Sequence, residues 1–158
     1  MQFELVFKRG MLCQLPRLPY LFLGESDYKE CERIFGQFEI NSETVLMAQS
    51  SGAGFLLKYL ALNHEIKAGQ LVLVAPWTDP EKTDASGFYD FSLDSDLPKR
   101  IGQIDLFYSK NEENEVLKTV DQLAAVYPGM IKHELNYNGH FGSSNTGYEQ
   151  PELLEVIK

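Results

Sequence analysis

Short, almost wholly apolar runs constrain this chain more than any other feature of its sequence. Thr44–Ala48 (TVLMA) and Leu71–Ala75 (LVLVA) contain no charged residue and are too short to be core helices. Such runs are typical of strands that are buried on both faces of a parallel sheet. Weaker strand candidates are Ile104–Tyr108, Ile131–Tyr137 and the short run Leu12–Leu15, which Pro16 ends.

Amphipathic segments with helical periodicity lie between these runs. The predicted helices are Ser26–Phe38, Gly52–Asn63, Val116–Tyr127 and Glu152–Ile157. Alternation of strands and helices predicts an α/β fold, a three-layer sandwich around a mainly parallel sheet. The length of 158 residues fits one domain over 1–158, and no repeat or linker interrupts it.

Charge, cysteine content and the length of apolar runs limit the binding partners and the cellular location that can be expected. The formal net charge of −9 argues against nucleic acid and against an anionic membrane surface. Cys13 and Cys31 form neither a disulfide framework nor a zinc motif, so we interpret them as reduced thiols of a cytoplasmic protein. No apolar run approaches the ~18 residues of a membrane span, and Lys8 and Arg9 are misplaced for a signal peptide.

A cluster of small residues follows the first apolar run. Ala48-Gln49-Ser50-Ser51-Gly52 is close to the pattern G-x-S-x-G, in which a tight strand-to-helix turn exposes a nucleophilic serine. Ser50 is then the candidate nucleophile, and the N–H of Ser51 a candidate oxyanion donor at a helix N-terminus. The alternative is an ordinary turn, because small polar residues also cap helices.

A triad also needs an acid and a histidine later in the chain. His140, between Gly139 and Phe141, follows the last predicted strand, and an acidic loop with Glu112 and Glu113 follows Ile104–Tyr108. The order serine, acid, histidine is that of α/β hydrolases. The alternatives are an ordinary loop histidine and a solvated acidic loop. His64 is interpreted as a helix C-terminal residue and His133 as a half-exposed strand residue.

The chain resembles a known family in several strings. They are "SETVLMAQSSGAGFLLKYL", "LVLVAPW", "ASGFYDF", "FYSKNEENEV", "NGHF" and "PELLEVI". The sequence is similar to the small serine hydrolases typified by retinoblastoma-binding protein 9 and its bacterial relatives. The resemblance runs from about residue 8 to the C-terminus, and it implies a compact α/β hydrolase with Ser50 as nucleophile and His140 as base. No metal or organic cofactor is implied.

Three features depart from the family pattern. Gln49 stands where histidine is usual, and Glu112 stands where the acid is usually aspartate, with Glu113 as the alternative acid. The resemblance also begins inside the family's first helix, so the first strand and the loop that supplies a second oxyanion N–H have no counterpart. Either the chain is a fragment or has a misplaced start, or Gln2–Phe7 replaces the strand, or the protein has lost catalysis and kept a shortened α/β-hydrolase-like scaffold.

The predicted function is a serine hydrolase that acts on a small acyl substrate such as an ester. Trp77 and Gln49 are predicted to contact the substrate, and Trp77, Phe88, Tyr89 and Phe91 could line an acyl pocket, although aromatic residues are more often core. The alternative is an inactive scaffold that binds a protein. A third hypothesis is a homodimer that forms through a strand left exposed by the missing first strand.

Overall fold

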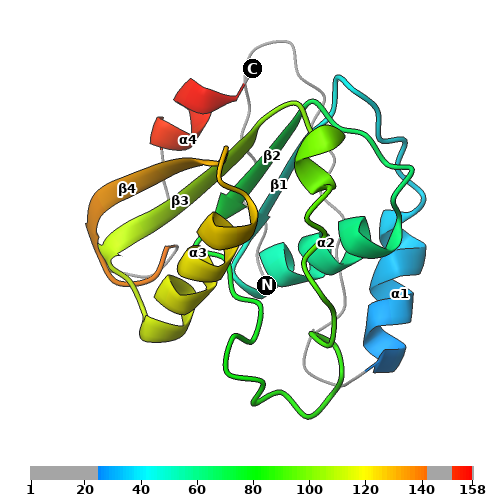
Figure 1. Cartoon of the computed structure of the whole chain (residues 1–158), viewed down its shortest axis with the longest axis horizontal. Helices are drawn as coiled ribbons and strands as arrows, with labels where there is room; N and C mark the ends of the chain where they lie inside the picture. Colours follow the sequence, from blue (N-terminus) through cyan, green and yellow to red (C-terminus); the bar gives the residue numbers. More distant parts are fainter. Residues whose placement is uncertain (1–24, 142–150, 158) are drawn as a thin grey trace.

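A parallel four-stranded sheet forms the centre of the computed structural model (Figure 1). The structure describes residues 25–141 and 151–157. Along the chain the elements are α1 (Glu25–Phe35), β1 (Val45–Gln49), α2 (Ser51–Leu62), β2 (Gln70–Val74), η1 (Leu97–Lys99), β3 (Ile104–Asn111), α3 (Asn114–Val126), β4 (Ile131–Asn138) and α4 (Pro151–Val156). The fold class is therefore α/β, as the sequence predicted.

The strands lie in the order β1-β2-β3-β4, so each strand pairs with the next one along the chain. All three pairings are parallel. The carboxyl ends of the strands consequently share one edge of the sheet, where Gln49 pairs with Val74 and Val74 with Phe107. In open α/β sheets this edge is where ligands bind.

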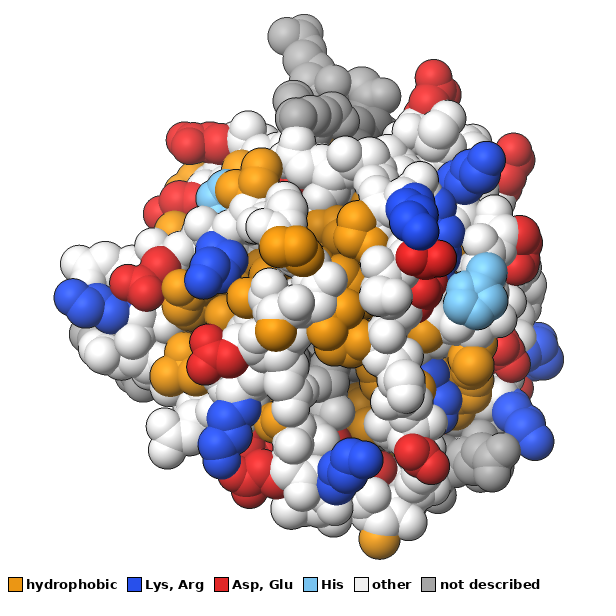
Figure 2. Space-filling model, viewed as in Figure 1, with side chains coloured by type: hydrophobic (Ala, Val, Ile, Leu, Met, Phe, Trp, Pro, Cys, Tyr) orange, Lys and Arg blue, Asp and Glu red, His pale blue; other side chains and the backbone are white. Residues whose placement is uncertain are grey.

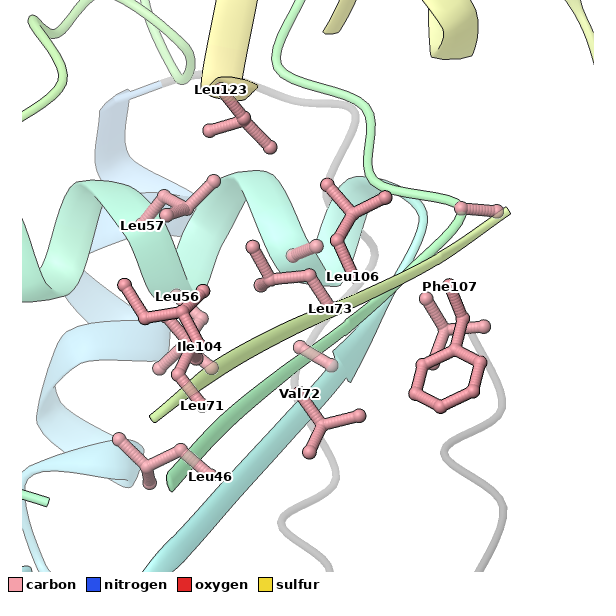
Figure 3. Packing of buried hydrophobic residues seen from close by; sticks show 14 of the residues in the cluster. Leu46, Leu56, Leu57, Leu71, Val72, Leu73, Ile104, Leu106, Phe107 and Leu123 are labelled. Carbon is pink, nitrogen blue, oxygen red and sulfur yellow. The ribbon is translucent and has the colours of Figure 1, made fainter. Parts of the chain in front are cut away.

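Helices cover both faces of the sheet. On one face, leucines of α2 and α3 pack on the strands; Figure 3 labels Leu56, Leu57 and Leu123 beside Leu46, Leu71, Leu73, Ile104 and Leu106. Val72 and Phe107 point to the opposite face. Gln70 alternates with Leu71 and so shares the face of Val72, where its amide donates to the Val156 carbonyl of α4 at 2.8 Å. The structure thus has the predicted three layers.

A smaller aromatic cluster joins α1 to α2 and to the loop after β2. Its buried members are Tyr28, Cys31, Phe55, Tyr59, Phe88 and Tyr89. The buried ammonium of Lys58 donates to the Phe88 carbonyl at 2.8 Å and so ties this loop to α2. Burial raises the pKa of the Cys31 thiol to about 12, which disfavours its reactive thiolate form.

Some bounds and burials differ from the prediction. α1 ends at Phe35 instead of Phe38, because the chain continues in tighter turns, in which the Gln37 N–H donates to the Ile34 carbonyl and the Phe38 N–H to the Phe35 carbonyl. The first described residue of α1 is Glu25, one residue before the predicted start. β3 runs to Asn111 instead of Tyr108. β2 is buried throughout, but β1 is buried only at alternate residues. The physical reason is that successive side chains of a strand point to opposite faces, and the face of β1 that carries Val45, Met47 and Gln49 is less covered than the other.

Three predicted features lie outside the described residues: the strand Leu12–Leu15, the replacement strand Gln2–Phe7 and Cys13. Within residues 25–141 and 151–157, no helix is long and apolar enough to cross a membrane. Figure 2 shows acidic and basic side chains interspersed over one face of the molecule, with hydrophobic side chains between them.

Candidate active site

Ser50 occupies a strained turn between β1 and α2. Its φ of 52° and ψ of −129° lie outside the regions that residues with a side chain usually adopt. Such backbone strain costs on the order of 1–3 kcal/mol and persists only where neighbouring contacts hold it. Here the Ser50 N–H donates to the Val74 carbonyl at 2.9 Å, and the Ser50 carbonyl accepts from Ala53 at 3.0 Å and from Trp77 at 3.1 Å.

The Ser50 side chain does not explain this turn as a helix cap. Ser50 occupies the N-cap position of α2, yet its side chain makes no capping hydrogen bond. A serine retained only for capping would accept, at its side-chain oxygen, a hydrogen bond from a backbone N–H in the first turn of the helix. The ordinary-turn alternative therefore loses its main physical reason, and the strain points to a role for the hydroxyl.

Close packing around the turn depends on small residues. Ala48 is 3% exposed beneath the turn. The tightest approach is at Gly54, where an added Cβ would lie 2.4 Å from the Trp77 carbonyl oxygen and 2.7 Å from a Tyr89 ring carbon. Sequence reasoning centred on Gly52, whereas Gly54 is the residue that lets α2 approach the loop after β2.

The backbone N–H of Ser51 is available at the start of α2. Ser51 is the first residue of this helix, where amides have no intrahelical acceptor. Within the described part of the chain, no hydrogen bond from this N–H is found. A helix N-terminus favours negative charge, so this amide fits an oxyanion.

Glu112 and His140 form a hydrogen-bonded pair. The imidazole Nδ1 lies 2.9 Å from Glu112 Oε1. The Glu112 side chain is shielded from solvent, and that of His140 is 26% exposed. Glu112 directly follows β3, and His140 follows β4 by two residues, so the carboxyl ends of two paired strands bring them together.

Glu113 has a different environment, although it is next in sequence. Its side chain is exposed, and it occupies the N-cap position of α3 without a side-chain capping bond. Its backbone N–H donates to Glu112 Oε1 at 3.1 Å. Of the two candidate acids, the structure therefore places Glu112 against the imidazole.

The carboxylate changes the acidity of the imidazole. The hydrogen bond from His140 to Glu112 raises the pKa of His140 above its ordinary value of 6.5. Burial acts in the opposite direction, and the charges of Glu112 and Glu113 add to the increase. A carboxylate at Nδ1 also favours the tautomer that carries its hydrogen on Nδ1 and leaves Nε2 unprotonated, which is the form that can act as a base.

Two further side chains contact the backbone on either side of His140. The Gln49 amide donates to the Phe141 carbonyl at 2.6 Å. The buried Ser109 hydroxyl donates to the Gly139 carbonyl at 2.7 Å. Sequence reasoning missed Ser109, because nothing in a strand pattern distinguishes it. Gln49 was predicted to bind substrate, and that role stays a prediction.

A hydrogen bond between adjoining residues connects the backbone segments of Ser50 and His140. The hydrogen bond between Gln49 and Phe141 joins the residue before Ser50 to the residue after His140. Among the contacts of the described residues, no hydrogen bond joins Ser50 Oγ to the imidazole. Catalytic hydrogen bonds are often long in unliganded enzymes and tighten when substrate binds.

The four aromatic residues that were predicted to line an acyl pocket differ in how far they are buried. Phe88 is fully buried, and Tyr89 is 8% exposed in the aromatic cluster. Trp77 is half-buried, stacks edge-on against Tyr89 at 4.7 Å, and donates its indole N–H to Glu115. Phe91 packs against the main core. Substrate contact by Trp77 stays a prediction, whereas Phe88 has no exposed surface to offer.

The other two histidines lie away from this group. His64, just after the end of α2, is exposed, and its Nδ1 lies 3.4 Å from Asp94 Oδ2. His133 is partly exposed, stacks on Phe107, and contacts the buried Asp105 at 2.8 Å. Within residues 25–141 and 151–157, no three His, Cys, Asp or Glu side chains are grouped to hold a metal ion.

Comparison with known proteins places the fold. No family model and no curated protein matches the chain. The ydeN gene product from B. subtilis superposes with a TM-score of 0.64 at 19% identity, over 89% of this chain and 74% of that one. A predicted CIB-like hydrolase from Thermoplasma acidophilum superposes with a TM-score of 0.51 at 15% identity, over 83% of this chain and 54% of that one.

The chain has an α/β-hydrolase-like fold. Ser50, Glu112 and His140 each lie just after the carboxyl end of a strand of its sheet. Identities below 20% show the architecture alone. Membership of the retinoblastoma-binding protein 9 family therefore stays a prediction.

Proposed function

We propose that the protein is a serine hydrolase that acts on esters or related small acyl compounds. The observation that carries the proposal is the strained, uncapped Ser50 at the sheet edge where the hydrogen-bonded Glu112–His140 pair also lies. The Ser50 side chain makes no capping hydrogen bond that would account for its strained backbone. Fold alone does not determine function, so the argument rests on these residues.

Each residue has a defined step in this mechanism. Ser50 Oγ attacks the acyl carbon while His140 Nε2 takes the hydroxyl proton, and Glu112 stabilises the resulting imidazolium. The Ser51 N–H binds the oxyanion. Collapse of the tetrahedral intermediate expels the alcohol, which receives the proton from His140. Water then attacks the acyl-enzyme while His140 takes its proton, and His140 returns that proton to Ser50 Oγ as the bond to the acyl group breaks and the acid leaves.

The first test is hydrolysis of a short activated ester such as p-nitrophenyl acetate. Removing the nucleophile of a triad costs on the order of 10⁶-fold in kcat, so Ser50→Ala is expected to have no activity above background. Ser92→Ala is the matched control, because Ser92 is an exposed loop serine. Hydrolysis that survives Ser50→Ala unchanged would refute the proposal.

A second candidate is an inactive scaffold that binds a protein. It is favoured by the missing hydrogen bond between Ser50 Oγ and His140 within the described residues. This alternative predicts that the folded wild-type protein hydrolyses no ester. Pairing of a strand edge with a second copy is a separate prediction, and light scattering that shows a monomer would contradict it.

A further inference from the structure

We propose that Gln49 and Ser109 are positioning residues that hold His140 in place from both sides. This inference rests on the proposed hydrolase function for its catalytic consequence, but the contacts stand independently. Ser109 binds the carbonyl before His140, at Gly139, and Gln49 binds the carbonyl after it, at Phe141. We call these two hydrogen bonds the carbonyl tethers.

The carbonyl tethers come from different strands. Ser109 lies in β3 and Gln49 is the last residue of β1, with β2 between them. The donor–acceptor distance is 2.7 Å for the Ser109 hydroxyl, which is usual for an O–H···O bond, and 2.6 Å for the Gln49 amide, which is short for an N–H···O bond. The loop that carries His140 is therefore held by hydrogen bonds from two strands, β1 and β3.

Ser109 acts on the loop backbone more than on the acid. Its hydroxyl has a single hydrogen, and the Gly139 carbonyl at 2.7 Å is a much closer acceptor than Glu112 Oε2 at 3.4 Å. Ser109 is fully buried, so water cannot replace the hydroxyl without rearrangement. Removing it leaves the partly buried Gly139 carbonyl without this donor, which is unfavourable.

Gly139 makes the loop dependent on such anchors. Its φ of 90° is a backbone conformation that glycine adopts readily and other residues rarely adopt. The conformational freedom of glycine next to His140 would let the ring move unless the neighbouring peptide groups were held. Three hydrogen bonds therefore hold His140: two bind the carbonyls of its neighbours, and one binds its Nδ1 to Glu112.

The catalytic consequence follows from geometry. Proton transfer from Ser50 requires Nε2 within about 3 Å of the hydroxyl, and a misplacement of about 1 Å costs about 10²-fold in rate. Gln49 adjoins Ser50, so its tether couples the nucleophile turn directly to the histidine loop. The engaged amide gives Gln49 a function that needs no substrate contact.

The test compares Gln49→Met, Ser109→Ala and the double variant with the wild-type protein. Methionine keeps the length of glutamine but has no N–H donor, and alanine removes only the hydroxyl. Gln122→Met and Ser92→Ala are matched controls at exposed positions. Gln49→His restores a donor on a different side chain and serves as a rescue variant.

The first readout is the pKa of His140, measured by proton NMR titration. Glu112 and Glu113 are the charged groups that act on this imidazole. Loss of both tethers lets the ring move away from Glu112, so the pKa of His140 is expected to fall toward 6.5. This readout does not depend on whether the protein hydrolyses anything.

The second readout is the rate of Ser50 labelling by a fluorophosphonate. We expect about 10²-fold slower labelling in the double variant, smaller losses in each single variant, and partial recovery in Gln49→His. If the pKa falls as expected but even wild-type protein is unlabelled, the tethers hold and the hydrolase proposal fails.

An unchanged His140 pKa and an unchanged labelling rate in a folded double variant would overturn the tether proposal and leave the hydrolase proposal standing. If the double variant does not fold, Gln49→Met decides alone, because Gln49 is only half-buried. In that case an unchanged pKa and labelling rate in Gln49→Met would overturn the proposal.

Discussion

Glu112 Oε1 lies 2.9 Å from His140 Nδ1, and the carboxylate is shielded from solvent. Its neighbour Glu113 is exposed and contributes only a backbone N–H to the same oxygen. Two adjacent glutamates therefore differ in their relation to one imidazole, and this difference provides a matched pair of substitutions.

We expect Glu112→Gln to reduce kcat for ester hydrolysis by about 10⁴-fold, the cost of replacing a triad carboxylate by an amide that selects the wrong tautomer. Glu113→Gln keeps the backbone N–H and is expected to stay within a few-fold of the wild type. Steady-state kinetics of both variants measure the difference. Equal losses in the two variants, or a larger loss in Glu113→Gln, would contradict the assignment.

The raised pKa of His140 predicts the pH dependence of activity. Neutral His140 is the base, so kcat/KM should increase with pH through the pKa of His140, which the Glu112 hydrogen bond places above 6.5. In Glu112→Gln the residual activity should increase at lower pH than in the wild type. A pH–rate profile of each protein tests this, and identical acidic limbs would contradict it.

The same pKa has the opposite effect on stability. Because folded His140 binds its proton more tightly than the unfolded chain does, the pair stabilises the folded state most below the unfolded pKa of about 6.5. That contribution is lost as the pH rises through the raised pKa. Urea denaturation at several pH values measures the free energy of unfolding. As the pH rises from about 6.5 through the pKa of His140, this free energy should fall less in His140→Gln than in the wild type.

Gly54 is expected to be intolerant of substitution. A Cβ there would lie 2.4 Å from the Trp77 carbonyl oxygen, so Gly54→Ala should cost about 1–3 kcal/mol through overpacking. Because the Trp77 N–H holds the Ser50 carbonyl, labelling of Ser50 should slow as well. Chemical denaturation and probe labelling measure the two effects.

Gly129→Ala is the matched control for Gly54→Ala. An added Cβ at Gly129 meets nothing within 4 Å, so its effect should stay below about 0.5 kcal/mol. Comparable destabilisation of the two variants would show that the contact with Trp77 is not the cause.

The sequence predicted the fold well where periodicity was strong. Ser51–Leu62 and Gln70–Val74 match their predicted helix and strand within one residue at each end, because apolar spacing determines both. The end of β3 was missed by three residues, since Ser109, Lys110 and Asn111 are polar and look like a loop. Pairing with β4 keeps these residues in the strand, and pairing is a long-range property.

The candidate site was only partly accessible from the sequence. Ser50, Glu112 and His140 could be selected because each follows a predicted strand, and parallel strands share one edge. The choice between Glu112 and Glu113 required the structure, because adjacent residues differ only in the direction of their side chains. Ser109 could not be recognised, since its role depends on a contact 30 residues away.

The most direct test of the central claim is labelling of the purified protein with a fluorophosphonate probe, with the modified residue identified by mass spectrometry. The account predicts covalent labelling at Ser50, which is absent in Ser50→Ala and strongly reduced in His140→Gln. No labelling of a protein that circular dichroism shows to be folded, or labelling at a residue other than Ser50, would contradict it.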